Sequence, residues 1–489
     1  MIRKLTPLKR EKILKNPIST FIQNWQVKTA TSIFTGPAIL LAFFFTSCEE
    51  PIEVESDLVP GGNNTEIRYV EFPLEMSHTA FDSLIISSNE VEGARGQIFV
   101  GHQNSPEIGD FSASAYFGAI LDQTFNRDSL TLDAQVIETR LSLGLNYFHG
   151  DDFDLPQKFI VYQLQDTLDV SDDYTIYDSF VTEEVISLDT SIVINPVDTI
   201  AEFVPLNNGF GSRVLDFIRI DDLSVEELYN ALRGFKIETE AGTNNLQGMS
   251  IAGGDAYIEV IYKKPNVDSV ESVILNLSGS SFSHINFSPG SLIPTDYSSK
   301  KSFELTDPSK AYFNNIIGIS PRISLANYLS FMDTVNYMQI NKAELVIKDE
   351  NFSINNSESV QLQPANNIVP YILNQEGEIE KEGEDFWALQ SNFNLNGGLA
   401  DPTEATSPIS LGFDPARNEI RGDISFFLQE IYNNPSFWNE ENSFMFTGQF
   451  IRRNERPFNE TPIINVGNFN NFLVDKENIT LRIYYTTFK

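Results

Sequence analysis

Residues 137–145 read Ile-Glu-Thr-Arg-Leu-Ser-Leu-Gly-Leu, and this stretch decides the fold class. Polar Glu138, Arg140 and Ser142 alternate with apolar or β-branched residues, which is the pattern of a strand with one buried face. The buried face is predicted to consist of Ile137, Thr139, Leu141, Leu143 and Leu145.

The same alternation recurs along the chain, for example in residues 159–164 and 256–262. Clusters of Asn, Asp, Gly and Ser separate such runs, as in a sandwich or barrel of short antiparallel strands. The 38 Phe and 17 Tyr residues supply a large core, so the chain is globular. One helix interrupts the pattern, because Ser224 and Glu227 form a capping-box signature.

The chain also resembles itself at a spacing of about 200 residues. Four features recur in the same order: a Leu-rich strand, an Asp followed by a helical turn, a Phe strand and a closing Tyr strand. The paired features are Leu143 and Leu345, Asp216 and Asp423, 235–237 and 444–446, and 258–262 and 480–484. Pro265 marks a boundary. We predict an all-β fold of two tandem antiparallel β-sandwich domains of jelly-roll type, residues 65–264 and 268–489. The alternative is two unrelated sandwiches that share only alternation and turn residues.

The first 47 residues are typical of a signal peptide. They carry seven Lys or Arg residues, an apolar stretch over 38–45, and then Thr46 and Ser47. Cys48 follows at once and is the only cysteine of the chain. A cysteine behind small residues resembles the bacterial lipobox, whose thiol is acylated. The sequence therefore predicts a lipoprotein signal peptide over 1–47 and lipidation, including palmitate, at Cys48. The alternative is an uncleaved signal anchor with an incidental cysteine.

Residues 48–64 are predicted to form an acidic lipidated tether. Glu49 and Glu50 stand directly behind the cysteine, with further acids after them. Acids at this place resemble the signal that sends lipoproteins of the Bacteroidota to the outer face of the outer membrane. The other interpretation is an ordinary solvated tether, because charged segments with Pro and Gly cannot bury a core. We expect a lipid-anchored outer-membrane protein that faces the cell exterior.

Charge excludes one large class of function. The chain has a net charge of −35, and removal of residues 1–47, with their seven basic and one acidic residue, leaves −41. Nucleic-acid binding requires clustered Lys and Arg, so no nucleic-acid partner is expected. With Cys48 used as the anchor, no disulfide can form within the chain.

Several segments resemble a family of Bacteroidota outer-membrane lipoproteins known only as a domain of unknown function. They are residues 99–116, the Asp-Ser dipeptides at 82–83 and 128–129, the strand 161–164 and the glycine-containing segment 248–254. The resemblance implies a surface lipoprotein with no accepted catalytic residues. The chain departs from the family's Gly-x-Tyr-x-Asp-Pro-x-Phe-Gly pattern at residues 101–109.

A second feature of the sequence also resembles proteins of the Bacteroidota. Asp followed by Ser or Thr and an aliphatic residue resembles the O-glycosylation acceptor of exported Bacteroidota proteins. The acceptor positions would be Ser83, Ser129, Thr167, Thr199, Ser269 and Thr334.

The sequence offers no recognisable catalytic motif. No two of the four histidines have metal-ligand spacing, and no Gly-x-Ser-x-Gly or phosphate-binding loop occurs. We therefore expect no cofactor. Structural calcium is an open alternative at residues 149–154 or at Asp169, Asp172 and Asp173, although neither group follows a calcium-loop spacing.

Two tryptophans are candidate contacts for a ligand or partner. Trp387 and Trp438 lie in polar, loop-like segments, where an exposed indole could stack on a sugar or anchor a protein partner. The alternative is that each covers the end of a core. The leading hypothesis is a non-enzymatic accessory subunit that docks on an outer-membrane β-barrel protein or assembly. The others are an extracellular glycan-binding module and, third, a surface hydrolase.

Overall fold

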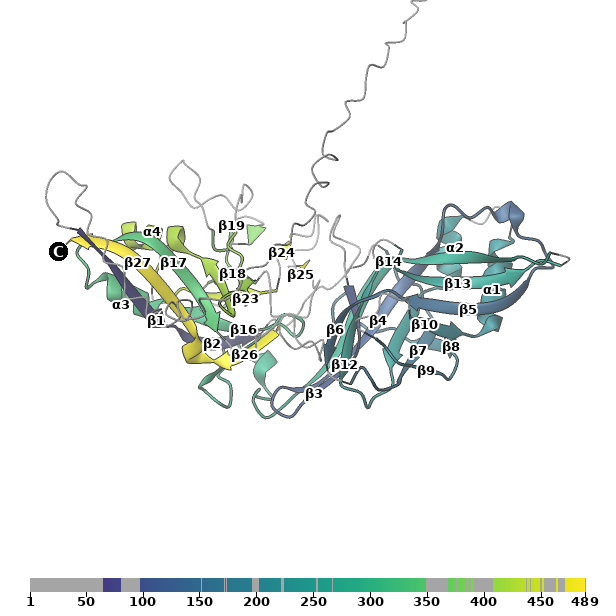
Figure 1. The fold of residues 1–489 in the computed structure, drawn as a ribbon, viewed down its shortest axis with the longest axis horizontal. Helices are drawn as coiled ribbons and strands as arrows, with labels where there is room; N and C mark the ends of the chain where they lie inside the picture. Colours follow the sequence, from purple (N-terminus) through teal and green to yellow (C-terminus); the bar gives the residue numbers. More distant parts are fainter. Residues whose placement is uncertain are drawn as a thin grey trace, which may run out of the picture. The chain divides into compact units, whose positions relative to one another are not determined.

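The computed structural model describes residues 65–80 and 97–488, with gaps of which the longest are 349–367, 391–407 and 453–462. The predicted signal peptide, the predicted lipidation site Cys48 and the predicted acidic tether lie outside the described residues. Among the described helices none is long and apolar enough to cross a membrane. The all-β prediction is confirmed, because the chain is mostly strand and every pairing between described strands is antiparallel (Figure 1).

Residues 97–289 form the N-terminal sandwich. Its strands follow the order β10-β5-β13-β14-β4-β11-β7-β8, with β12 pairing β3 and β6, β3 pairing β4, and β9 pairing β7. The elements are β3 (Gln97–Ser105), β4 (Gly109–Leu121), η1 (Arg127–Ser129), β5 (Gln135–Leu143), β6 (Leu145–Gly150), β7 (Gln157–Leu164), β8 (Thr182–Val185), β9 (Ser191–Ile192), β10 (Phe203–Leu206), α1 (Asn208–Ile218), α2 (Val225–Leu232), β11 (Phe235–Thr239), β12 (Asn245–Ser250), β13 (Ala256–Lys263) and β14 (Val270–Pro289).

The C-terminal sandwich combines residues 65–80 with 310–488. One sheet has the order β1-β27-β17-β22-β21, and the other has β18-β23-β16-β15-β26 with β2 on β16. The elements, with small pairs and turns included, are β1 (Thr65–Pro73), β2 (Glu75–Ala80), β15 (Lys310–Asn314), β16 (Ile319–Ser324), α3 (Ala326–Met332), β17 (Gln339–Lys348), β18 (Val369–Leu373), β19 (Lys381–Glu382), β20 (Asp385–Phe386), β21 (Gly412–Asp414), β22 (Glu419–Asp423), α4 (Ser425–Asn433), β23 (Ser443–Thr447), β24 (Ile451–Arg452), β25 (Ile463–Ile464), β26 (Asn471–Asp475), η5 (Lys476–Asn478) and β27 (Ile479–Phe488). The short η2 (Tyr297–Ser299) belongs to the segment between β14 and β15.

The two sandwiches exchange their first strands. In the sequence, β1 and β2 open the first repeat and β14 opens the second. In the structure, β1 pairs with β27, the last strand of the second repeat, and β2 pairs with β16. Reciprocally, β14 pairs with β13, the last strand of the first repeat, and with β4. Each sandwich is therefore completed by the opening strand of the other repeat.

The strand registers show that the two repeats are equivalent. The β13–β5 and β27–β17 pairings both shift register at the same place, so that Tyr262 faces Val136 and Tyr485 faces Ile340. Further along β14, a bulge between Leu277 and Ser281 stands where β1 gives way to β2. The bulge in β14 and the break between β1 and β2 thus fall at equivalent positions of the two exchanged segments.

The exchanged strands also make the same contact in the core. The backbone N–H of Phe99 in β3 donates to the Ser283 Oγ on β14 (2.8 Å). At the equivalent point, the N–H of Tyr312 in β15 donates to the His78 Nε2 on β2 (3.1 Å). In each sandwich, a side chain of the exchanged strand thus satisfies a buried backbone donor.

The repeat predicted from the sequence needs three corrections. The registers make Leu141 the equivalent of Leu345, because both face equivalent residues of the closing strands. Asp216 lies inside α1, whereas Asp423 ends β22, so the helix equivalent to α4 is α1 and not α2, the helix that Ser224 caps. The domain boundaries are wrong as folded units, since residues 65–80 belong to the C-terminal sandwich and β14 to the N-terminal one.

Each sandwich buries its own apolar core, and a third cluster joins residues of both. This shared cluster contains Phe99 and Tyr147 from the N-terminal sandwich together with Tyr312 and Ile319. Burial of apolar area contributes roughly 25 cal/mol per Å², so the shared cluster helps to hold the strand exchange in place.

The stretch that decided the fold class behaves as predicted in its middle and not at its ends. Thr139, Leu141 and Leu143 are buried. Ile137 is 47% exposed because the register shift in β5 turns it outward, and Gly144, at φ +53°, ends β5 before Leu145 begins β6. Ser142 is buried as well, and its hydroxyl donates to the Asp255 carbonyl (3.0 Å). The capping box of α2 is confirmed.

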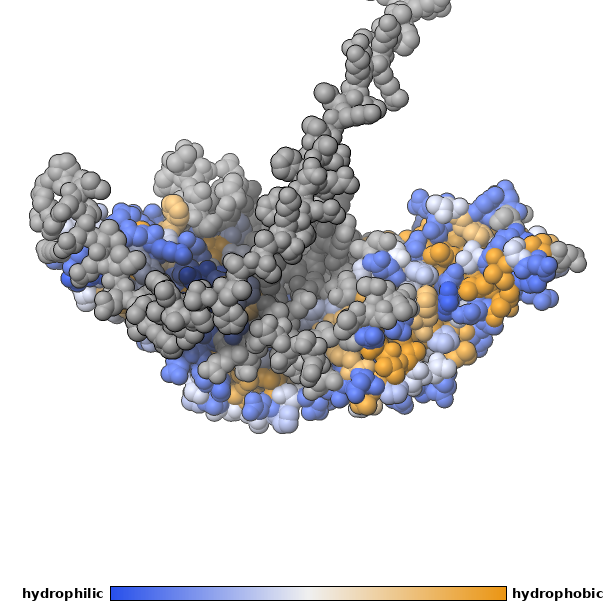
Figure 2. All heavy atoms as spheres, viewed as in Figure 1, coloured by the Kyte–Doolittle hydropathy of each residue, from blue (hydrophilic) through white to orange (hydrophobic). Residues whose placement is uncertain are grey.

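Exposed apolar side chains gather on the N-terminal sandwich, where Figure 2 shows several hydrophobic residues at the surface. Around β8 and β9, four aliphatic side chains are each at least 46% exposed: Val181, Val185, Leu188 and Val193. Neighbouring exposed aliphatic residues of this kind often mark contact surfaces.

The protein is expected to lose stability as the pH is lowered, because of His78. Burial, with a smaller effect from Lys476, lowers the pKa of His78 to about 3. In the unfolded chain His78 takes up a proton near pH 6.5, whereas in the folded chain it does so only near pH 3. The contribution of neutral His78 to stability is therefore complete above pH 6.5 and declines toward pH 3, by about 1.4 kcal/mol per pH unit. Protonation of Nε2 would also remove the acceptor for Tyr312.

The measurement is denaturant unfolding of the wild-type chain and of H78Q at pH 7.5, 6.5 and 5.5. Gln keeps an acceptor but does not titrate, so H78Q should lose stability less steeply with falling pH than the wild type. Parallel pH slopes for the two proteins would contradict the prediction.

Candidate functional site

The outer face of the sheet β1-β27-β17-β22-β21 carries the most concentrated group of charged side chains that we find among the described residues. Alternation produces it, because Leu481 and Ile483 of β27 point into the core while Thr480, Arg482 and Tyr484 point outward. We call it the polar face. Its residues are Tyr69, Glu71, Lys342, Glu344, Lys348, Asp414, Glu419, Arg421, Thr480, Arg482 and Tyr484.

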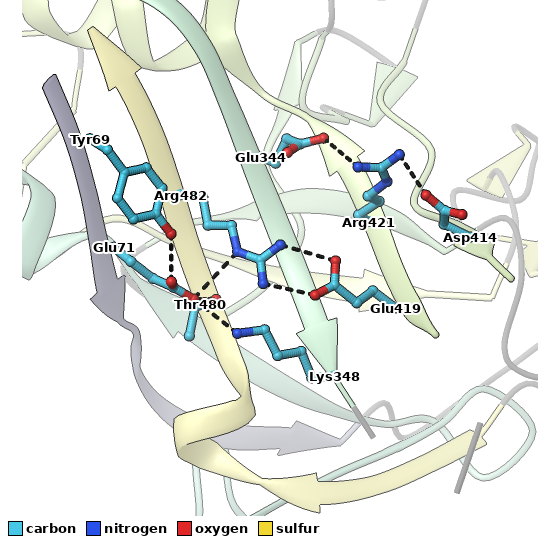
Figure 3. Close-up of polar contacts among 9 residues, drawn as sticks. All are labelled: Tyr69, Glu71, Glu344, Lys348, Asp414, Glu419, Arg421, Thr480 and Arg482. Carbon is cyan, nitrogen blue, oxygen red and sulfur yellow. Dashed lines mark hydrogen bonds and ion pairs between the residues drawn. The ribbon is translucent and has the colours of Figure 1, made fainter. Parts of the chain in front are cut away.

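Arg482 is the centre of the first ion-pair group, as Figure 3 shows. Its two terminal nitrogens bind both oxygens of Glu419, at 3.0 and 2.8 Å, and its Nε lies 3.4 Å from Glu71. Glu71 also accepts from the Lys348 Nζ (3.1 Å), the Tyr69 hydroxyl (2.6 Å) and Thr480 (2.9 Å). The bidentate geometry fixes the guanidinium plane, which a Lys could not do.

Arg421 organises a second group beside it. Its guanidinium binds Glu344 at 3.2 Å and Asp414 of β21 at 2.6 Å (Figure 3). Lys342 binds the same oxygen of Glu344 at 2.9 Å. The two groups together hold planar charged side chains in fixed orientations across strands β1, β27, β17, β22 and β21.

Four groups of the polar face, Tyr69, Glu71, Glu344 and Arg482, keep their protonation over the ordinary pH range. Burial would raise the pKa of Glu71, but hydrogen bonds from Tyr69, Thr480 and Lys348 lower it to about 2. Burial likewise opposes the fall in the pKa of Glu344, which Lys342 and Arg421 produce. Burial and Glu71 raise the pKa of Tyr69, and Glu419 raises that of Arg482. These groups can exchange hydrogen bonds with a ligand without changing protonation.

An open depression of about 650 Å³ lies on this face, lined by Lys342, Glu344, Arg417, Glu419, Arg482 and Tyr484. Tyr484 is 40% exposed, and its ring lies 4.9 Å from that of Tyr69 at an angle of 43°. The depression thus combines charged hydrogen-bonding groups with an aromatic side chain at its border.

The fold alone does not require these charges, because the equivalent face of the N-terminal sandwich lacks most of them. Register places Ile274 at the position of Glu71 and Phe203 at that of Arg421. Arg140 and Glu259 pair there at 2.8 Å, and the Arg140 guanidinium lies 4.0 Å from the centre of the Phe203 ring. The polar face is therefore a property of the second repeat.

The two predicted tryptophan contacts have different outcomes. Trp438 is only 2% exposed, and its ring packs edge-on against Phe427 at 5.2 Å. Its role as a surface contact is wrong, because the indole covers part of the C-terminal core. Trp387 lies outside the described residues.

The histidines and acids offer no metal centre in the parts of the chain that the structure describes, where no group of three potential ligands meets. His149 lies 2.8 Å from Gln103, and His102 lies 3.4 Å from the Thr239 carbonyl. In residues 149–154, the first of the two groups considered for calcium, the Asp152 carboxylate accepts from the backbone N–H of Asn244 (2.7 Å).

The predicted glycosylation positions are scattered. Ser269 and Thr334 are exposed, and Thr167 is half-buried with its hydroxyl 3.4 Å from the Asn230 carbonyl. Ser129 belongs to η1, while Ser83 and Thr199 lie outside the described residues.

Sequence reasoning missed the polar face entirely. The signal was present, because Lys342 and Glu344 in one segment and Arg482 and Tyr484 in another occupy the polar positions of alternating strands. Their partner Glu71 lies more than 400 residues before Arg482, and no local pattern indicates that these strands pair.

Comparison with known proteins gives no assignment: no family model, no curated protein and no solved structure matches this chain.

Proposed function

We propose that this chain is a non-enzymatic lipoprotein of the outer membrane that faces the cell exterior and binds a carbohydrate on its polar face. The anchoring and orientation rest on Cys48, Glu49 and Glu50 in the sequence. The resemblance to Bacteroidota surface lipoproteins supports the same location. The observation that carries the binding function is the depression bordered by Tyr484 and lined by fixed charged side chains.

A sugar fits this chemistry better than an apolar ligand. The depression, at about 650 Å³, is open and lined mostly by charged side chains, unlike the largely apolar sites that enclose apolar ligands. Carboxylates and guanidinium groups exchange hydrogen bonds with hydroxyls, and an exposed tyrosine can lie against a sugar ring.

Binding is favoured over hydrolysis by the carboxyl groups. A glycosidase needs one carboxylic acid whose pKa is raised, so that it can protonate the leaving oxygen. On the polar face, the pKa values of Glu71 and Glu344 are lowered instead, and Glu419 is bound through both oxygens by Arg482.

The test is binding of a soluble C48S chain to a glycan array. Tyr484→Ala should reduce binding about tenfold or more, because stacking on the ring is lost. Tyr257→Ala is the matched control, since Tyr257 is a partly exposed tyrosine on the equivalent face of the N-terminal sandwich. An array without signal, or equal effects of the two substitutions, would contradict the proposal.

The second candidate function is that of an accessory subunit on an outer-membrane β-barrel protein. The exposed aliphatic residues around β8 and β9 favour it, because protein interfaces use such surfaces. Crosslinking on intact cells, followed by affinity purification, would reveal a stoichiometric membrane partner. Recovery of the protein alone would remove this candidate.

A further inference from the structure

The depression on the polar face contains an excess of positive charge. Lys342, Arg417 and Arg482 line it together with only two acids, Glu344 and Glu419. Such an excess is unusual in a chain with a net charge of −35. A local cationic site on an acidic protein attracts an anionic ligand that the rest of the surface repels.

Two of these three cations are already paired. Arg482 is bound by both oxygens of Glu419, and Lys342 lies 2.9 Å from Glu344. Arg417 is exposed, and within the described part of the chain its guanidinium makes no hydrogen bond or ion pair. It is therefore the charge of the depression that remains for a ligand.

The turn between β21 and β22 holds the backbone of Arg417 in place. The Asp414 carboxylate accepts from the N–H of Ala416 (3.0 Å), and the Asp414 carbonyl accepts from the N–H of Arg417 (3.2 Å). Asn418 closes the turn at φ +55°, a conformation that Asn tolerates well. The other oxygen of Asp414 binds Arg421, so the turn is tied to the ion pairs of the polar face.

We propose that the depression selects a sugar that carries a carboxylate, a uronic acid, and that Arg417 is its counter-ion. This inference rests on the proposed carbohydrate-binding function. The sugar ring lies against Tyr484, and its hydroxyls donate to the free lone pairs of Glu344 and Glu419. An acidic peptide suits the site less well, because it brings few hydroxyl donors to these two carboxylates.

The experiment uses the mature lipoprotein in mild detergent and an array of uronic-acid oligosaccharides beside their carboxyl-reduced, neutral counterparts. The acidic forms should bind about tenfold tighter or more, as expected for a charge-assisted hydrogen bond. Arg417→Gln should reduce acidic binding to the neutral level and remove its salt dependence. Lys300→Gln, an exposed cation paired with Asp296 outside the depression, is the control and should change neither.

The outcomes separate the two proposals. Equal binding of acidic and neutral forms, unchanged by Arg417→Gln, would overturn the uronic-acid assignment and leave carbohydrate binding intact. Absence of binding to any sugar would overturn the proposed function as well. A circular dichroism spectrum of Arg417→Gln equal to that of the wild type establishes that a loss of binding is not a loss of fold.

Discussion

Deletion of residues 65–80 is expected to unfold the C-terminal sandwich and to leave the N-terminal sandwich folded. The deletion removes β1 from nine paired positions on β27, and it removes Leu74 and Met76 from the core. Each large apolar side chain lost from a core costs about 2–5 kcal/mol. Together with the lost strand pairing, this approaches the whole stability of a domain, about 5–15 kcal/mol.

Hydrogen exchange followed by mass spectrometry measures the two sandwiches separately. Amide protection should disappear from β17, β27 and β16 in the deleted chain, whereas β5 and β13 should remain protected. If the deleted chain kept native protection in β27, the strand exchange would be wrong.

Two fragments provide the matched comparison. Residues 97–306 contain β14 and the following segment with Leu292 and Ile293, so this fragment should fold as a monomer. Residues 65–264 correspond to the sequence repeat but lack β14. The opening strands of this fragment, β1 and β2, have Glu71 where β14 has Ile274 and His78 where β14 has Ser283. They fit the N-terminal sandwich poorly, so the fragment 65–264 should not fold as a monomer.

Cys48→Ser is expected to move the protein entirely from the membrane fraction to the soluble fraction. We propose that the thiol is the acylation site. Each buried methylene of an acyl chain contributes about 0.8 kcal/mol, so two or more chains anchor a protein stably.

The measurement is fractionation of cells that are labelled with a palmitate analogue. Wild-type protein and Ser269→Ala, a control at an exposed serine, should be labelled and sediment with membranes. Should Cys48→Ser still sediment after an alkaline wash, the uncleaved signal anchor would be the correct interpretation.

The sequence predicted what depends on local periodicity. Alternation in residues 139–143 and in 256–262 indicated strands, and the capping box at Ser224 located a helix. It also indicated the duplication. These features are visible because the side chains that specify them are neighbours in the chain.

The sequence could not show the features that depend on which strands pair and on tertiary contacts. Val70 and Phe72 of β1 stand in register where β14 has Val273 and Leu275, so alternation does not decide which closing strand each pairs with. The register shift that exposes Ile137 and the packing of Trp438 on Phe427 arise from tertiary contacts. The polar face has the same origin, because it needs Glu71 beside Arg482.

The strand exchange has a consequence for the history of the fold. Reciprocal donation of one element between two equivalent units is the arrangement of a domain-swapped homodimer with twofold symmetry. A gene for a single repeat would make that dimer from two identical chains. Every substitution would then alter the equivalent surface of both chains. Fusion of two such repeats near Pro265 would make the partner permanent, at an effective concentration that does not depend on expression. In one polypeptide each surface can also change alone, as the corresponding places of Glu71 and Ile274 illustrate.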